Sequence, residues 1–232
     1  MATENHLLRI LDKATLALLK PNMRTINVRH GESLLSASRE IEFAYFPRST
    51  IISVLARTGQ GQTAETSIVG REGVVGSSSI HGVMTSFAET VVQVAGEAVR
   101  IPAADIHHVG RQSDSFRNIV ALFDLSLLAQ SQQSTACQAL HHVENRAARW
   151  LLQCQRRVGR NDIRLTQEFF AQMLGVQRTT VNMVERTFQN AGLIRIGRGR
   201  ISILDPEGLQ ATSCDCYLRI ERRYEELLGP LD

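Results

Sequence analysis

The chain has almost no lysine: Lys13 and Lys20 are the only two, and the rest of its 26 basic side chains are arginines. Long apolar runs are also missing, because no segment approaches the roughly 20 residues that a membrane-spanning helix needs. The first residues, Met1–Asn5, lack a signal-peptide pattern. These absences predict a cytoplasmic protein that does not enter a membrane. The hydrophobic content of 43% is ample for packed cores, and 232 residues suit two modest domains.

Cysteine is scarce, with four residues in the whole chain. Cys137 and Cys154 stand alone in segments of helical pattern, where most cysteines are inert packing residues. Cys214 and Cys216 are too close in sequence for an ordinary disulfide, and no second pair completes a zinc site. We therefore expect free thiols, no metal and no cofactor. Redox or metal sensing through Cys214 and Cys216 is the less favoured alternative.

Histidine occurs in two adjacent pairs, His107-His108 and His141-His142, and His141 follows Cys137 at the i, i+4 spacing. Such pairs suggest a metal site or acid–base chemistry. However, no carboxylate completes a recognised metal spacing, and no set of nucleophile, base and orienting group can be assembled. The sequence therefore predicts that the protein is not an enzyme.

Positive charge is concentrated in the last third of the chain. The formal net charge is only +3, yet the segment from Val143 to Leu204 contains eleven arginines and four acidic residues, a local excess of +7. Guanidinium groups bind phosphates and guanines through a planar fork of donors. The segment therefore has the electrostatic character of a protein that binds double-stranded DNA.

Within this segment, residues 165–184 have the pattern of a helix-turn-helix. Thr166 can cap a first helix, Gly175 permits a sharp turn, and a second helix begins near Arg178. Small and apolar residues at fixed offsets allow the two helices to cross closely. The second helix presents residue types that reach base edges and phosphates. We predict DNA contacts from Thr166, Gln167, Gln177, Arg178, Thr179, Thr180, Asn182, Met183 and Arg186.

A β-hairpin follows the two helices. The alternating residues 193–196 and 201–204 flank the turn Gly197-Arg-Gly-Arg200. Such a hairpin is a wing, and we expect Arg198 and Arg200 at its tip to contact the phosphate backbone. A structural helical hairpin with a solvated arginine turn is the alternative. A winged domain that binds protein within a ligand-sensing signalling module is another alternative.

The first half of the chain has a different pattern of apolar and polar residues. Residues 5–19 are periodic like a helix before Pro21, and residues 102–109 suggest a short helix. Between them, short apolar runs alternate with Gly, Ser and Asn, which predicts an antiparallel β-roll that can enclose a small ligand. The expected strands are 24–29, 33–35, 42–47, 51–56, 63–69, 89–94 and 97–101.

Residues 114–157 are helical nearly throughout, too long for one ordinary helix, so we expect a break near His141. The long first helix is suited to pair with its copy across a two-fold axis. The alternative is a helix that only packs on the β-domain. Trp150 and its neighbours are expected in the core of the DNA-binding domain. Residues 209–228 suggest a terminal amphipathic helix of undefined role.

A β-roll, a long helix and a winged helix-turn-helix in this order resemble the Crp/Fnr (cyclic-AMP receptor protein/fumarate-nitrate regulator) family of bacterial transcription factors. The resemblance rests on residues 142–152, 165–168 and onward to 204, and more loosely on 30–32, 45–47, 70–76 and 98–105. It implies an α+β fold with a cyclic-nucleotide-binding-like jelly roll at 1–112, a dimerisation helix at 113–140 and a winged helix-turn-helix domain at 141–232. It also implies a homodimer that binds double-stranded DNA and RNA polymerase.

The sequence also departs from the pattern of this family at several positions. Arg178 matches an arginine that reads guanine, but Thr179 and Met183 stand where other members carry glutamate and arginine, so a different operator is expected. Thr166 and Gln167 match phosphate contacts. Gly76, Ser77, Ser78 and Ser79 would line the effector pocket, yet no arginine follows in 77–90 to neutralise a cyclic phosphate. The effector, if any, is therefore expected to be another small molecule. No cysteine precedes Cys137 for an N-terminal iron–sulfur cluster. His81 lies near a haem-ligand position of the family, but a lone surface histidine is the favoured interpretation.

Overall fold

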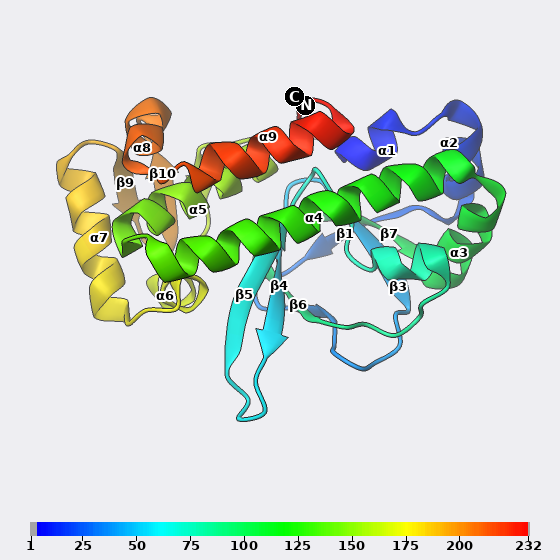
Figure 1. The fold of residues 1–232 in the computed structure, drawn as a ribbon, viewed down its shortest axis with the longest axis horizontal. Helices are drawn as coiled ribbons and strands as arrows, with labels where there is room; N and C mark the ends of the chain where they lie inside the picture. Colours follow the sequence, from blue (N-terminus) through cyan, green and yellow to red (C-terminus); the bar gives the residue numbers. More distant parts are fainter. Residues whose placement is uncertain (1–3, 232) are drawn as a thin grey trace.

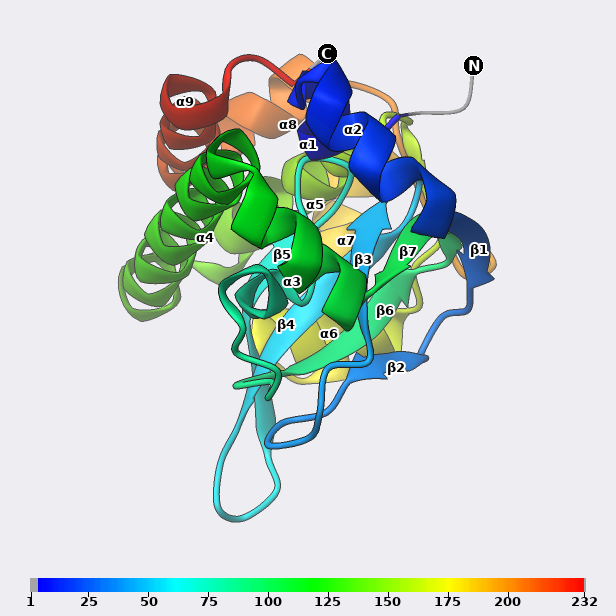
Figure 2. The ribbon, with the colours of Figure 1, turned by 90° about the vertical axis from the view of Figure 1, so that its right-hand side faces the viewer.

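A computed structural model describes residues 4–231. Its N-terminal part is a β-roll made of two antiparallel sheets, with strand orders β1-β7-β3 and β2-β6-β4-β5. The strands are β1 (Arg24–Val28), β2 (Ser33–Leu35), β3 (Phe43–Pro47), β4 (Ile51–Arg57), β5 (Thr63–Val69), β6 (Glu89–Val94) and β7 (Gly96–Pro102). The predicted strands are confirmed to within about one residue at each end. Hairpin β4–β5 projects from the body of the molecule (Figures 1 and 2).

The first helical segment is broken, contrary to the continuous helix expected over 5–19. Helices α1 (His6–Ile10) and α2 (Lys13–Leu19) are separated at Leu11 and Asp12. The Asp12 carboxylate accepts a hydrogen bond from the backbone N–H of Thr15, so it caps a new helix instead of continuing the first. A 3-10 turn, Lys20–Asn22, then extends through Pro21. Residues before Glu4, used in the leader-peptide argument, lie outside the described residues.

A long helix spans the molecule and confirms the predicted break. After α3 (Ala103–Gln112), α4 runs from Asp114 to Leu140, and α5 from Val143 to Val158. The chain is extended at His141 and His142 between them. The buried side of α4 packs Phe116, Val120 and Phe123 into the core of the β-roll.

The C-terminal part is the expected winged helix-turn-helix, at one end of the molecule (Figure 1). Its elements are β8 (Asp162–Ile163), α6 (Gln167–Leu174), α7 (Arg178–Asn190), β9 (Ile194–Gly197), β10 (Arg200–Ile203) and α8 (Pro206–Thr212). The third strand, β8, was not predicted because it is only two residues long; it pairs with β10. Trp150, Leu151 and Leu152 are buried in this core, as predicted.

The last helix returns to the body of the molecule. Helix α9 (Cys216–Leu228) runs beside α4 (Figure 1). Tyr224, Leu228 and Leu231 belong to the same hydrophobic cluster as the β-roll core. The chain therefore leaves the winged domain and closes back over the long helix, and Leu231 lines the same small pocket as Glu4. None of the helices within residues 4–231 combines the length and the apolar character that crossing a bilayer requires.

Candidate nucleic-acid interface

The geometry of the two crossed helices follows from a few residues. The Thr166 hydroxyl accepts a hydrogen bond from the backbone N–H of Phe169 and caps α6. Gly175 ends that helix at φ +63°, in the left-handed region where a side chain is strained. Phe170, Val181 and Phe188 are buried between the helices and the rest of the domain. This packing fixes which face of α7 points outward.

The outward face of α7 carries most of the residues predicted to contact DNA. Gln177, Arg178, Thr179 and Arg186 are exposed, and Met183 is 63% exposed. Thr180 and Asn182 are only partly exposed, and the Asn182 Oδ1 atom is buried without a hydrogen-bond partner. The N-terminal half of α7 therefore presents amide, hydroxyl and guanidinium groups to solvent.

The wing and the starts of α6 and α7 enclose one groove. Its volume is about 360 Å³, and its lining includes Thr166, Gln167, Arg178, Arg198 and Arg200. The predicted residues from three separate elements are thus brought to one concave surface. The Gln167 amide donates a hydrogen bond to the Glu185 carboxylate at 2.6 Å, so part of its donor capacity is already used inside the protein.

The basic segment divides into an exposed part and a buried part, which corrects the charge count made on the sequence. Seven of its eleven arginines are exposed: 160, 164, 178, 186, 195, 198 and 200. In contrast, Arg149 and Arg157 are buried, and Arg156 pairs with Glu221. Counting charges along a sequence cannot distinguish the two groups. The surface available to a polyanion is formed by α7, the wing and the residues just before α6.

Comparison with known proteins agrees with this geometry. Residues 145–212 match the Crp-like helix-turn-helix domain. A CRP-like cAMP-activated global transcriptional regulator from Mycobacterium tuberculosis is 25% identical over 86% of this chain and 92% of its own length. This chain therefore carries a Crp-like helix-turn-helix domain. Its relatives are transcription regulators and not enzymes, in agreement with the sequence-based prediction.

Solved structures share the fold of this chain. FixK2 from Bradyrhizobium japonicum aligns with a TM-score of 0.69 at 12% identity, covering 83% of this chain and 98% of FixK2. A CRP/FNR family regulator from Thermus thermophilus aligns with a TM-score of 0.62 at 20% identity, covering 82% of this chain and 98% of the regulator. The predicted α+β architecture of β-roll, long helix and winged helix-turn-helix is therefore confirmed.

The β-roll contains a small and mostly apolar cavity of about 190 Å³. Gly76, Ser77 and Ser78 line it, as expected for an effector pocket. Ser79 does not, because it is buried and its hydroxyl donates a hydrogen bond to the Gly76 carbonyl. The remaining lining is Leu35, Ile41, Val54, Val69, Val74, Val75, Ser86, Phe87, Ala88, Thr90 and Leu127. Within the described chain, no basic side chain lines this cavity.

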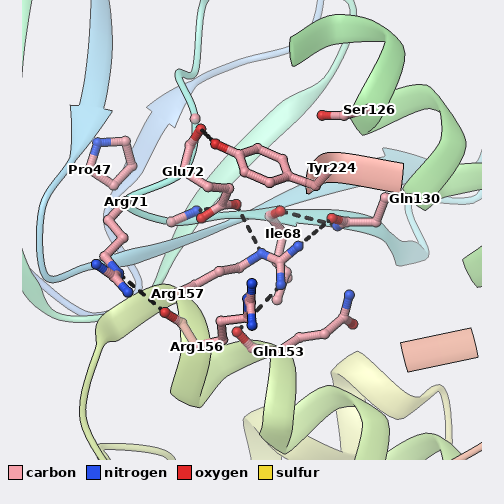
Figure 3. A network of polar contacts seen from close by, with 12 residues as sticks. Pro47, Ile68, Arg71, Glu72, Ser126, Gln130, Gln153, Arg156, Arg157 and Tyr224 are labelled. Carbon is pink, nitrogen blue, oxygen red and sulfur yellow. Dashed lines mark hydrogen bonds and ion pairs between the residues drawn. The ribbon is translucent and has the colours of Figure 1, made fainter. Parts of the chain in front are cut away.

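A buried ion network, which sequence reasoning missed, connects the β-roll to α4, α5 and α9 (Figure 3). Arg157 of α5 pairs with Glu72 of the β-roll and with Glu221 of α9, each at 2.9 Å. It also donates a hydrogen bond to Gln130 of α4. A Cβ atom on Gly70 would lie 2.5 Å from the Cβ of Arg157, so the glycine permits this close approach. Four segments of the chain therefore meet at one guanidinium.

Proposed function

We propose that the protein is a homodimeric transcription regulator that recognises a two-fold-symmetric operator in double-stranded DNA. The observation that supports this best is the groove in which Arg178, at the N-terminus of α7, faces the wing arginines Arg198 and Arg200. A recognition helix in the major groove contacts bases with its N-terminal residues, while a wing contacts the backbone. The proposed division is a sensor at 1–112, a dimerisation helix at 113–140 and a DNA-binding domain at 141–232.

The roles of individual residues follow from their chemistry. Arg178 can donate two hydrogen bonds to one guanine, whereas Thr179 offers a single hydroxyl and Met183 no hydrogen-bond donor. We infer base contacts from Arg178 and its exposed neighbours. Phosphate contacts are assigned to Thr166, Gln167, Arg198 and Arg200, with Arg186 further along the helix.

The proposed dimer interface is the solvent-facing side of α4. Leu125 and Leu128 are each 54% exposed there, although leucine is usually buried. Exposed or half-buried residues recur on this face at alternating spacings of four and three, as in a coiled coil: Leu122, Leu125, Ala129, Gln132, Ala136 and Ala139. A second copy of α4 would cover this stripe and place two recognition helices about one turn of DNA (~34 Å) apart.

We infer that the effector, where one acts, is a small and largely apolar molecule. The named relative from Mycobacterium tuberculosis is activated by cAMP. A cyclic phosphate buried here would meet aliphatic side chains and hydroxyl groups without a cation, at a cost of several kcal/mol. Leu127 of α4 is part of the cavity wall, so occupancy can alter the packing of the dimerisation helix. RNA polymerase remains the partner implied by membership of the family.

The central test is selection of bound duplexes from a random pool, with and without metabolite extract. Arg178→Ala should then lose about 1–3 kcal/mol of binding free energy at the selected site, with relaxed preference at one base pair. The matched control is Arg111→Ala, which removes an exposed arginine of α3 in the sensor part. Unchanged affinity and selectivity in Arg178→Ala would remove this side chain from base recognition.

Salt dependence separates DNA binding from the alternative in which the winged domain binds protein. Each phosphate contact releases counterions, so the logarithm of the affinity for DNA should fall steeply with the logarithm of the salt concentration. Removal of Arg198 or Arg200 should make this slope shallower by about one. A flat response in the unmodified protein would instead favour a protein ligand.

A further inference from the structure

Four side chains of the types that commonly ligate metal ions, three cysteines and one histidine, lie together beside the end of the long helix. Cys137 lies in the last turn of α4, and His141 is the first residue after this helix. Cys214 lies in the connection between α8 and α9, and Cys216 is the first residue of α9. The three Sγ atoms and an imidazole nitrogen all lie within 4.8 Å of one another. The sequence-based expectation that no other residues complete a metal site with Cys214 and Cys216 is therefore wrong, because the fold brings Cys137 and His141 to them.

The distances suit one tetrahedral ion. Sγ of Cys137 is 3.4 Å from Sγ of Cys214, and Sγ of Cys216 is 3.4 Å from Nδ1 of His141. Zinc binds thiolate at about 2.3 Å and imidazole at about 2.0–2.1 Å, which separates ligand atoms of a tetrahedron by about 3.5–3.8 Å. An ion at the centre would therefore need only small adjustments of the side chains.

The donor set also has the chemistry of a structural zinc site. Three soft thiolates and one imidazole favour zinc over hard ions such as Mg²⁺ or Ca²⁺. All four positions of the tetrahedron would be filled by protein, which leaves no open position for catalysis. Cys137 and Cys216 are fully buried, and Cys214 is 9% exposed, so the ion would be shielded from solvent.

Polar and basic groups surround the cluster. The Gln133 amide donates a hydrogen bond to Sγ of Cys216 at 3.1 Å. Three thiolates and one Zn²⁺ leave a net charge of −1. Arg149 and its neighbour Arg146 supply compensating positive charge in the same region.

The position of the cluster in the fold gives it a mechanical consequence. The Crp-like domain spans residues 145–212, so His141 precedes it and Cys214 follows it directly. Both ends of the DNA-binding domain are therefore held at one point, against the last turn of α4. An ion there would connect the entry and the exit of the domain to the proposed dimerisation helix.

We propose that Cys137, His141, Cys214 and Cys216 bind one zinc ion, which fixes the orientation of the winged domain relative to α4. The proposal concerns the metal and stands independently of which operator or effector the protein recognises. Its failure would leave the DNA-binding assignment unchanged.

The test uses the full chain purified without a polyhistidine tag. Elemental analysis should find about one zinc ion per chain, as four protein ligands to a single ion require. Replacement of zinc by Co²⁺ should give the intense visible absorption of tetrahedral cobalt together with thiolate-to-cobalt charge transfer. These measurements on the unmodified protein do not depend on whether a variant folds.

Variants assign the ligands. Cys216→Ser and His141→Ala should each lose most of the bound zinc. In Cys216→Ser saturated with Co²⁺, the charge-transfer absorption per bound cobalt ion should fall by about a third, because one of three thiolates is gone. Gln133→Leu should weaken zinc binding by about 10- to 100-fold, since it removes only a hydrogen bond to a ligand. Cys154→Ala is the control: this buried cysteine lies outside the cluster, and its loss should leave zinc content unchanged.

Three results would overturn the proposal. One is metal-free protein that takes up neither Zn²⁺ nor Co²⁺ with its thiols reduced. The second is a disulfide between Cys137 and Cys214 in freshly isolated protein, found by mass spectrometry without reductant. The third is iron with acid-labile sulfide, which would replace the zinc ion by an iron–sulfur cluster.

Discussion

Glu65 joins the β-roll to the DNA-binding domain through one carboxylate. Its Oε1 atom accepts a hydrogen bond from Nε1 of Trp150 on α5 at 2.8 Å, and its Oε2 atom accepts one from the Ser53 hydroxyl. Burial raises the pKa of Glu65 from 4.5 to about 7, although these two hydrogen bonds oppose the shift. The contact between the two parts therefore changes charge close to neutral pH.

The first prediction concerns the pH dependence of stability. The pKa of Glu65 is higher in the folded state than in the unfolded state, so protonation of this carboxyl group favours folding. This contribution to the free energy of unfolding is lost as the pH rises through about 7. Glu65→Gln removes the titration. Relative to this variant, the free energy of unfolding of the unmodified protein should fall by on the order of 2 kcal/mol between about pH 5 and about pH 8.

Chemical denaturation of both proteins at several pH values measures this difference. The glutamine carbonyl can still accept the hydrogen bond from Trp150, so near pH 5 the two stabilities should be similar. Parallel pH profiles for the two proteins would show that Glu65 ionises normally at the junction.

Burial was also the property that sequence reasoning missed at the level of single residues. Arg178 and Arg157 are indistinguishable in a count of charges, yet one faces solvent and the other lies between three segments that are distant in sequence. Cys137 and Cys214 are separated by 77 residues, so no local spacing could show that they meet. Side chains whose roles depend on local pattern, such as the Thr166 cap and the Gly175 turn, were predictable.

At the scale of elements, the strands and the break near His141 were predictable because apolar alternation and helical periodicity act within a few residues. The break at Asp12 carried a local signal, an N-capping carboxylate, that the apolar periodicity on both sides concealed. The position of α9 was not predictable, since an amphipathic helix shows that it has a buried face but not which element covers it.

Helix α4 allows a prediction about assembly. Leu125→Asp places a charge in the centre of the proposed stripe, and in a two-fold interface each aspartate would face the equivalent region of the other copy. Burying an uncompensated charge costs several kcal/mol, so the dimer dissociation constant should rise by on the order of 100-fold or more. Sedimentation equilibrium measures the change.

Leu18→Asp is the matched control, because Leu18 is 44% exposed on α2 and lies outside the stripe. It introduces the same charge in place of the same side chain and should leave the dimer intact. If Leu125→Asp sediments like the unmodified protein, the stripe on α4 is not the interface.

The whole molecule depends on contacts between its parts. The β-roll residues Ile51, Leu55, Ile68 and Val94 belong to the same hydrophobic cluster as the winged domain. On the polar side, Arg157 connects the β-roll, α4, α5 and α9. Because the apolar contacts are non-directional, directional polar contacts specify one mutual arrangement of these parts, and the Arg157 guanidinium joins the most segments.

Arg157→Met tests this role. The substitution keeps most of the side-chain volume but leaves the buried Glu72 without its counter-charge and Glu221 with Arg156 alone, and removing one partner of a buried pair costs about 3–5 kcal/mol. Arg156→Met is the adjacent control: its side chain is 28% exposed and pairs nearer the surface, so about 1 kcal/mol or less should be lost.

A second comparison separates lost packing from lost charge balance. Adding Glu72→Gln and Glu221→Gln to Arg157→Met should recover part of the stability, because neutral amides need no counter-charge. Denaturant unfolding followed by Trp150 fluorescence reports on the junction itself, since Trp150 is hydrogen-bonded across it. Equal and small losses for Arg157→Met and Arg156→Met would mean that Arg157 is not needed to hold the β-roll and the winged domain in their mutual arrangement.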